Sequence, residues 1–265
     1  MMKYPTVSAS LIMMVTACGG GGGGASLDQN TPTPTPTPIP SCQASPTSLS
    51  DTPCAGAEMT LQIITVTSPK DVSENTNTVV LSDLNMQRED LFQGYSHVAG
   101  LMGNTNEAMA YVPMSGTLPA QTLTYEGAAH VETVNPAYQS HAYSLKMDAT
   151  IEIDLAKTTP DMDIVLLNGT DHSALSGNAT IPVTGDERVS INNLTLDPTT
   201  GRFSTTATST ITQRDFVAGA TVKTYSNLTL AGGLAGPNGI ELGMVVGAEG
   251  NGSITMQIVG KQLDQ

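Results

Sequence analysis

The side chains best suited to covalent or metal chemistry in this chain are three cysteines and four histidines. Cys42 and Cys54 bracket a loop rich in Ser, Thr and Pro, and two such thiols can pair as a disulfide in an oxidising compartment. On the chain-entropy argument, closing a loop this short stabilises a fold by roughly 3 kcal/mol. Two free thiols are the alternative. Neither cysteine has a Cys or His pair nearby, so no metal site is predicted there.

The third cysteine, Cys18, ends a segment with the layout of a secretory signal. Lys3 provides a positive start, and a mostly apolar or small run continues to Ala17, too short for the roughly 20 residues of a membrane span. The tetrapeptide Val15-Thr16-Ala17-Cys18 resembles the lipobox of bacterial lipoproteins. The resemblance implies that residues 1–17 are removed as a signal peptide and that Cys18 carries lipid. An ordinary signal peptide followed by an unrelated cysteine is the alternative.

Residues 18–41 have the composition of a tether. Six consecutive glycines, Gly19–Gly24, precede four Thr-Pro repeats in residues 31–38. Polyglycine is flexible and alternating proline is extended, and neither buries enough apolar surface to fold. Several acyl chains anchor a protein firmly, because each buried CH₂ contributes about 0.8 kcal/mol. By analogy with lipoproteins, Gly rather than Asp after the lipidated cysteine implies the outer membrane, and we expect a lipid-anchored location at the cell surface.

Two histidines form the candidate ligand site. His130 and His141 flank a predicted turn between two strands, so they can converge at one end of the fold, where haem capture would need His, Tyr or Met ligands beside an apolar slot. Exposed loop histidines are the alternative. His97 lies in a strand-like run nearer the N-terminus, and we expect it at the surface. No resident cofactor or metal is predicted.

Motifs of the common catalytic classes are missing from the sequence. It contains no GxSxG, no HExxH, no phosphate loop ending in GK[ST] and no Cys/His nucleophile arrangement. We therefore predict a protein that is not an enzyme, with no catalytic residues.

Composition excludes further classes of function. The formal net charge is −14, and removal of residues 1–17 takes away Lys3 and no acidic residue, so a nucleic-acid partner is not expected. There is no Trp and there are only three Phe. This aromatic content argues against a transmembrane barrel with aromatic girdles, and against stacking on sugars or bases.

The elements that must position these residues are strands. From Tyr143 to Leu155, apolar and polar residues alternate without interruption, which predicts a long strand with one buried face. Ile240 to Val246 and Ile254 to Ile258 repeat the pattern around Gly-rich turns. With further runs, the segment 119–265 holds about eight strands, enough for an antiparallel barrel whose interior is filled by side chains or holds one small ligand. The further runs are 121–132, 162–167, 188–196, 203–212 and 221–230.

Residues 42–118 are predicted to form a separate, small, handle-like β unit, so that the whole chain is all-β, with no amphipathic helix in the mature part. We place the boundary near Leu118-Pro119. The strand-like runs of the smaller unit are 59–67, 78–81, 95–102 and 108–114.

The C-terminal hairpin resembles a known group. The segments Leu230–Pro237 and Ile240–Met244 are similar to the glycine-punctuated hairpin of the transferrin-binding-protein-B-type β-barrel, and Tyr125–Ala129 and Ile191–Ser204 fit earlier hairpins of that barrel. The lipobox, tether, handle and barrel are also the layout of single-lobed surface lipoproteins in that superfamily. Leu234 and Ala235 stand where members often have aromatic residues, and one barrel replaces two lobes, so transferrin itself is not the expected partner.

Two hypotheses of function follow. In the first, which rests mainly on the resemblance, a surface lipoprotein binds a small solute related to haem or metal, or a host protein, in nutrient acquisition, and an outer-membrane translocator exports it. In the second, it is a structural or adhesive surface lipoprotein with a solid barrel and no small ligand. The barrel interior distinguishes the two, since a solute site needs a cavity with convergent polar groups.

Overall fold

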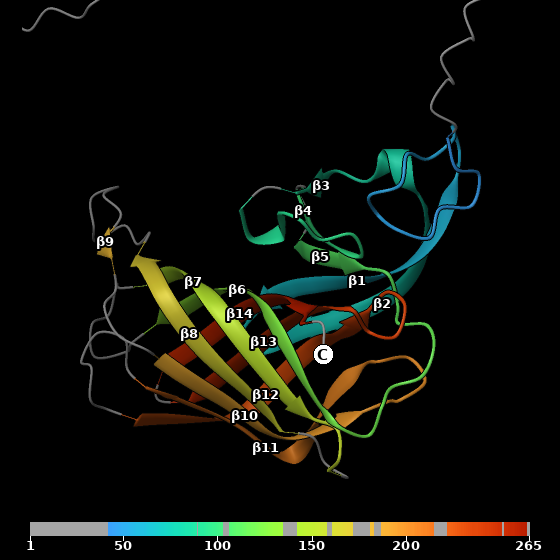
Figure 1. Ribbon diagram of the computed structural model, residues 1–265. Helices are drawn as coiled ribbons and strands as arrows, with labels where there is room; N and C mark the ends of the chain where they lie inside the picture. Colours follow the sequence, from blue (N-terminus) through green and yellow to red (C-terminus); the bar gives the residue numbers. More distant parts are fainter. Residues whose placement is uncertain are drawn as a thin grey trace, which may run out of the picture. The chain divides into compact units, whose positions relative to one another are not determined.

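Two antiparallel sheets make up the fold (Figure 1). The computed structural model describes residues 42–88, 90–102, 106–134, 142–157, 161–171, 181–182, 187–214, 222–250 and 252–263. These residues belong to one compact unit that begins at Ser41. Within the described residues, helical structure is limited to two short 3₁₀ turns, so the predicted all-β class is confirmed.

The larger sheet closes into a barrel of eight strands. The strand order is β10-β11-β12-β13-β14-β6-β7-β8, and β8 pairs with β10 to complete the ring. The two-residue strand β9 pairs only with the end of β8. The predicted eight-stranded antiparallel barrel is therefore confirmed. Its strands are β6 (Thr122–Val134), β7 (Ala142–Asp154), β8 (Met162–Asp171), β9 (Ile181–Pro182), β10 (Glu187–Leu196), β11 (Phe203–Arg214), β12 (Val222–Ala235), β13 (Glu241–Gly250) and β14 (Gly252–Gln262).

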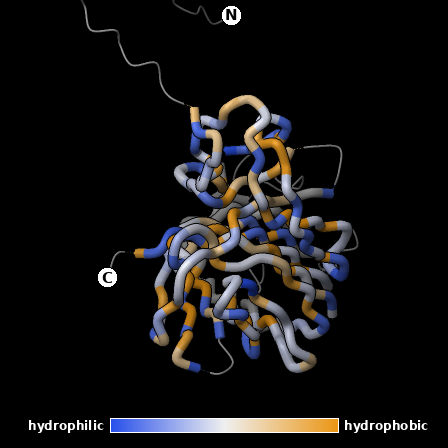
Figure 2. Tube along the Cα trace, turned by 90° about the vertical axis from the view of Figure 1, so that its right-hand side faces the viewer, coloured by the Kyte–Doolittle hydropathy of each residue, from blue (hydrophilic) through white to orange (hydrophobic). Residues whose placement is uncertain are grey.

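The period-two pattern sets the register of the barrel. In β7, Ala149, Ile151 and Ile153 are buried in the barrel core, and Glu152 between them is exposed. β6 and β7 pair without a slip from Thr122 opposite Asp154 to Val134 opposite Ala142. A slip of one residue would turn every apolar side chain to the outside, so the alternation specifies the pairing. Hydrophobic and hydrophilic residues are accordingly interspersed along the strands in Figure 2.

The smaller sheet, which we call the handle sheet, has the order β2-β1-β5-β4-β3. On the face away from the barrel, Leu61 and Ile63 of β1 pack with Leu49 of the N-terminal loop and Leu81 of the first 3₁₀ turn. The elements of the handle sheet are β1 (Glu58–Ser68), β2 (Asp71–Val80), β3 (Met86–Gln87), β4 (Val98–Leu101) and β5 (Glu107–Tyr111), with 3₁₀ turns η1 (Leu81–Asp83) and η2 (Asp90–Phe92).

The handle sheet differs from its prediction in one strand above all. The apolar run 78–81 marks only the end of β2, which begins at Asp71. The residues before this run, Ser73 to Asn77, are polar and mostly exposed, so they carry no apolar periodicity. They are held as a strand by continuous pairing with β1, from Val72 opposite Val66 to Val80 opposite Glu58.

The other face of the handle sheet packs against the outside of the barrel. Ile64, Val98, Met109 and Tyr111 of the handle sheet share one apolar cluster with barrel residues of β12, β13 and β14. Those barrel residues are Ala231, Ala235, Val245 and Val259. Part of the barrel wall is therefore buried on both faces.

Candidate functional site

The barrel interior is the place where a small solute was expected. Most of the described side chains that point inward form one apolar cluster whose buried members are at most 5% exposed. Such packing matches a solid core, in which few voids exceed the size of a water molecule. The cluster consists of Met114, Leu123, Tyr125, Ala129, Val131, Ala149, Ile151, Ile153, Met162, Ile164, Val189, Ile191, Leu194, Phe203, Ile211, Tyr225, Leu234, Leu242, Met244, Val246, Ala248, Ile254, Met256 and Ile258.

Two polar side chains on the inner side of the described barrel, those of Tyr125 and Ser209, form hydrogen bonds within the protein. The hydroxyl of Tyr125 donates a hydrogen bond to the carbonyl of Gly239 at 2.8 Å. The buried hydroxyl of Ser209 in β11 donates to the carbonyl of Asn193 at 2.7 Å and accepts from the N–H of Thr206 at 2.7 Å. Burial raises the pKa of Tyr125 far above the ordinary tyrosine value, so this phenol stays protonated. The described interior therefore resembles a hydrophobic core rather than a solute site.

His130 lies on the outside of the barrel. Its neighbours in β6, Ala129 and Val131, are buried in the core, so alternation points the half-buried His130 outward. It is paired across the sheet with Gln257 of β14 and Lys146 of β7. His141 lies outside the described residues, so the convergence of the two histidines stays a prediction.

His97 was expected at the surface, and this expectation is wrong. The residue is only 8% exposed, because it lies where the handle sheet meets the barrel. A Cβ on Gly236 would lie 2.6 Å from the Cγ of His97, so only glycine allows the ring to fit. No sequence pattern marked this position, because its burial comes from a barrel segment more than a hundred residues later in the chain.

Glu241, the first residue of β13, joins the barrel to the handle segment around His97. It is 1% exposed and accepts hydrogen bonds from the backbone N–H groups of Ser96 at 2.8 Å and His97 at 2.7 Å. The Nδ1 atom of His97 lies 3.6 Å from the same carboxylate. Burial by itself raises the pKa of Glu241, but the imidazole and the two N–H groups outweigh it and hold the pKa below the usual glutamate value.

Two further groups near Glu241 respond to its charge. The pKa of Tyr95 is raised to about 12, chiefly by burial and then by the negative charge of Glu241. Burial lowers the pKa of Arg88, and the attraction of Glu241 opposes that shift. Arg88 donates to the carbonyl of Leu49 and to that of Tyr95, and so ties the N-terminal loop to the handle sheet beside Glu241.

Glu74 of β2 makes the reciprocal connection, from the handle sheet into the barrel. Its side chain is 3% exposed. It accepts hydrogen bonds from the hydroxyl of Tyr111 at 2.8 Å and from the backbone N–H of Gly232 at 2.9 Å, and it pairs with the Nε of Arg202 at 2.9 Å. We call the contacts of Glu74 and Glu241, with the shared apolar cluster, the handle–barrel joint.

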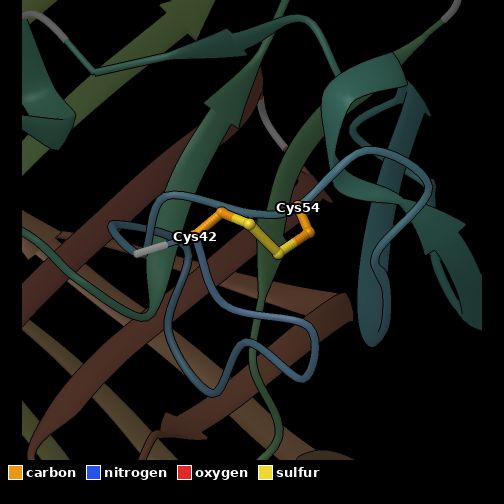
Figure 3. The surroundings of a disulfide bond; sticks show 2 residues. All are labelled: Cys42 and Cys54. Carbon is orange, nitrogen blue, oxygen red and sulfur yellow. A yellow bond between two sulfur atoms is a disulfide. The ribbon is translucent and has the colours of Figure 1, made fainter. Parts of the chain in front are cut away.

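Cys42 and Cys54 form a disulfide in the structure (Figure 3), with their Cα atoms 4.8 Å apart. The bond closes the loop that carries Leu49, whose backbone N–H donates to the carbonyl of Ser96 at 2.8 Å. The predicted pairing is thus present, and it braces the segment beside Glu241. Cys18 lies outside the described residues, and its lipidation stays a prediction.

The described residues include neither a candidate metal site nor a candidate membrane-spanning helix. In that part of the chain, no group of three or more His, Cys, Asp and Glu side chains is arranged to hold a metal ion. No helix there is long and apolar enough to cross a membrane.

No protein-family model matches the chain, and the search of curated proteins found no match. Among solved structures, a crystal structure of a surface lipoprotein is similar, with 16% identity and a TM-score of 0.40 over 78% of this chain and 99% of that one. Transferrin binding protein B from serogroup B Neisseria meningitidis has 12% identity and a TM-score of 0.42, over 77% of this chain and 43% of its own.

The N-lobe domain of lactoferrin binding protein B from Moraxella bovis is also similar, with 12% identity and a TM-score of 0.39, over 80% of this chain and all of that domain. The chain thus spans less than half of the transferrin binding protein chain. Its structural neighbours are of the type that the glycine-rich hairpin indicated. With similarity at this level, the ligand and partner of this chain have to be argued from its own residues.

Proposed function

We propose that this protein is a lipid-anchored surface lipoprotein that acts as a non-catalytic binding module for a protein partner. The observation that supports the proposal most is the packed, apolar barrel interior in the described residues. Since apolar side chains fill the described part of that interior, the proposal assigns binding to the outer surface of the barrel and the handle sheet. From the family resemblance, the partner is a host protein in nutrient acquisition.

The anchor is part of the same proposal. Residues 1–17 act as a signal peptide, Cys18 carries lipid, and residues 18–41 hold the handle (42–118) and the barrel (119–265) away from the outer membrane. The Cys18→Ser variant should lose palmitate labelling and leave the membrane fraction, whereas Ser26→Ala in the tether should keep both. A Cys18→Ser protein that still incorporates palmitate would contradict the lipobox interpretation.

A panel of small solutes tests whether the barrel interior binds a ligand. A ligand present at a hundred times its Kd stabilises the folded state by about 2.7 kcal/mol, which raises Tm by roughly 5–10 °C for a unit of this size. We expect haem and metal chelates to leave Tm and the haem absorbance band of the soluble Cys18→Ser protein unchanged. A shift of that size with any of them would overturn the protein-partner proposal in favour of a small solute.

The second candidate, a structural or adhesive surface protein, is favoured by the same apolar packing of the described interior. The two are separated by comparing cells that display the wild-type protein with cells that display none. Saturable capture of a soluble, purified host protein supports the binding module. Adherence of the cells to surfaces or to each other, with no such capture, supports the second candidate.

A further inference from the structure

Strand β2 forms an open edge of the handle sheet. The barrel closes on itself, and the opposite edge of the handle sheet, β3, is only two residues long. β2, by contrast, has ten residues, from Asp71 to Val80, and it pairs with β1 on one side alone. Among the described residues, no backbone hydrogen bond reaches its other side. An edge of this kind presents a row of unpaired N–H and C=O groups to another chain.

The register of β1 and β2 determines which backbone groups of the edge are unpaired. The N–H of Leu81, just after β2, donates to the carbonyl of Ala57 at 3.1 Å, so the ladder of β1 and β2 starts there with a hydrogen-bonded pair. Hydrogen-bonded and non-hydrogen-bonded pairs alternate along an antiparallel ladder. The odd-numbered residues of β2 therefore bond to β1. The residues whose N–H and C=O groups face the open side are Glu74, Thr76, Thr78 and Val80.

The side chains of β2 agree with this assignment. In an antiparallel sheet, side chains approach each other most closely in non-hydrogen-bonded pairs. The hydroxyl groups of Thr60 and Thr78 are 3.1 Å apart, and the hydroxyl of Thr76 donates to the Oε1 of Gln62 at 3.0 Å. Thr76 and Thr78 thus contact β1 through their side chains, and their backbone groups face away from it.

The usual protections of an edge strand are missing from β2. Natural edges are guarded by Lys, by Pro or by bulges. Residues 71–80 contain no Lys and no Pro, and the pairing with β1 runs without a slip from Val72 to Val80. Residues 75–78 are all exposed. Residues 75–80 also carry no charge, in a chain with a formal net charge of −14, so two copies can pair here without placing like charges opposite each other.

The barrel leaves this part of the edge uncovered. On the barrel side of β2, Val72 packs against the apolar cluster of the joint, and Glu74 accepts a hydrogen bond from Gly232. Thr76 and Thr78 continue the same face of the strand but are exposed, so the barrel does not cover them. When two β2 strands pair antiparallel with Asn77 at the centre, the two barrels lie over opposite ends of the pair. They are therefore displaced from each other along the strand direction.

We propose that the open edge of β2 binds the same edge of a second copy of this chain, as an antiparallel strand pair with a two-fold axis at Asn77. The unpaired groups require an extended backbone as their occupant, and a second copy supplies one that is already formed. In this register, Thr76 exchanges backbone hydrogen bonds with Thr78 of the second copy, and the two handle sheets become one. Such a self-complementary two-fold contact is the commonest symmetry of homo-oligomers. The inference does not depend on the proposed binding of a host protein.

The two-fold axis provides a site-specific test. On the axis, Asn77 faces Asn77 of the second copy in a non-hydrogen-bonded pair, whose Cα atoms are about 4.5 Å apart, within the range that a disulfide bridges. In the soluble Cys18→Ser protein, Asn77→Cys should therefore give a disulfide-linked dimer on mild oxidation. The matched control is Asn75→Cys, which replaces an exposed Asn on the same face of the same strand. Its two thiols lie about 13 Å apart along the strand and should not cross-link.

A proline tests the backbone hydrogen bonds directly. Thr76→Pro removes an N–H that faces the open side, a position at which an edge strand tolerates proline. It should weaken the dimer of the Cys18→Ser protein roughly tenfold or more in sedimentation equilibrium, because the bond is lost in both copies. Thr76→Val loses the same hydroxyl but keeps the N–H, so it should dimerise like the parent protein. Thermal unfolding checks that both variants are folded.

A protein that stays monomeric at all concentrations, or equal cross-linking at positions 75 and 77, would overturn the proposal. A dimer that Thr76→Pro leaves intact would also overturn it, because another surface would then hold the two copies. Capture of a purified host protein by a monomeric chain, lost in Thr76→Pro, would assign the edge to that partner instead. Loss of the dimer in Thr76→Pro with host-protein capture retained would support the proposal and leave the proposed function standing on a different surface.

Discussion

The two faces of strand β13 are both buried, but by different means. Toward the barrel interior it presents Leu242, Met244 and Val246, which interdigitate in an apolar core. Toward the handle sheet it presents Glu241, Gly243, Val245 and Gly247. Large apolar side chains fill the inner face. The outer face combines a carboxylate with small residues that allow the handle sheet to approach closely.

The difference shows how two sheets of one chain are held in a single arrangement. Apolar packing is non-directional, so a flat apolar face alone specifies a docking angle weakly. Glu241 reaches from the barrel to two N–H groups of the handle segment, and Glu74 reaches from the handle sheet to Gly232 and Arg202. We infer that the contacts of these two carboxylates, which run in opposite directions, define the register of the handle–barrel joint.

The largest expected effect is at the joint. Glu241→Ala leaves two backbone N–H groups without an acceptor, and breaking such a buried charged contact typically destabilises by about 3–5 kcal/mol. Denaturant unfolding measures the loss, and hydrogen exchange should show it first around Ser96 and His97. Glu126→Ala, at an exposed position on β6, is the control and should change stability by no more than about 0.5 kcal/mol. Equal effects of the two variants would show that the joint does not depend on Glu241.

Lowering the pH should also remove part of the stability that Glu241 contributes to the joint. Because the pKa of Glu241 is lower in the folded protein than in the unfolded chain, its contribution is present above the ordinary glutamate pKa of about 4.3 and is lost as pH falls through the lowered value. The stability difference between wild type and Glu241→Gln should therefore shrink as pH falls below about 4.3. A difference that stays constant with pH would contradict this linkage.

A smaller effect is expected where the handle sheet touches a glycine. A Cβ on Gly247 would lie 2.2 Å from the carbonyl oxygen of Pro69, in the turn between β1 and β2. Gly247→Ala should force that turn away and destabilise by about 1–3 kcal/mol. Gly250→Ala makes the same change on the same strand, where the nearest atom is 4.0 Å away, and should be close to neutral. Similar losses in both variants would point to strand propensity rather than to the joint.

The smallest expected effect is a single methyl group in the barrel. Ile151→Val removes it from a fully buried position facing the core and should destabilise by about 0.5–1.5 kcal/mol. Hydrogen exchange should change across the barrel strands and leave the contacts of Glu241 intact. A loss confined to the handle sheet would contradict the separation of core and joint.

The barrel was predictable because its strands carry their own pattern. Every inward position of Tyr143 to Leu155 that the structure describes in detail, from Ala149 on, is buried or half-buried as expected. The same logic placed one apolar face on residues 240–246, but it assigned the other face of that strand to solvent. Gly247 was interpreted as the start of a Gly-rich turn, but it lies within β13. There, like Gly243, it has no side chain and so leaves room for the handle sheet to approach.

The candidate site was harder to predict, because its residues belong to no periodic pattern. His97 and Glu241 come together across a large sequence separation, and neither neighbourhood signals the other. Only one member of the predicted histidine pair can be placed. His130 points outward from the barrel, and His141 lies outside the described residues.

The sequence alone determined the strands of the barrel, their inner face and the possibility of the Cys42–Cys54 bond, because alternation and residue spacing are local properties of the chain. Only the tertiary structure decided that the described interior is packed, that the handle sheet covers one side of the barrel, and that Glu74 and Glu241 are buried. The reason is physical: burial of a polar group depends on which distant donor reaches it, and Ser96, Arg202 and Gly232 reach these carboxylates only where the handle sheet packs against the barrel.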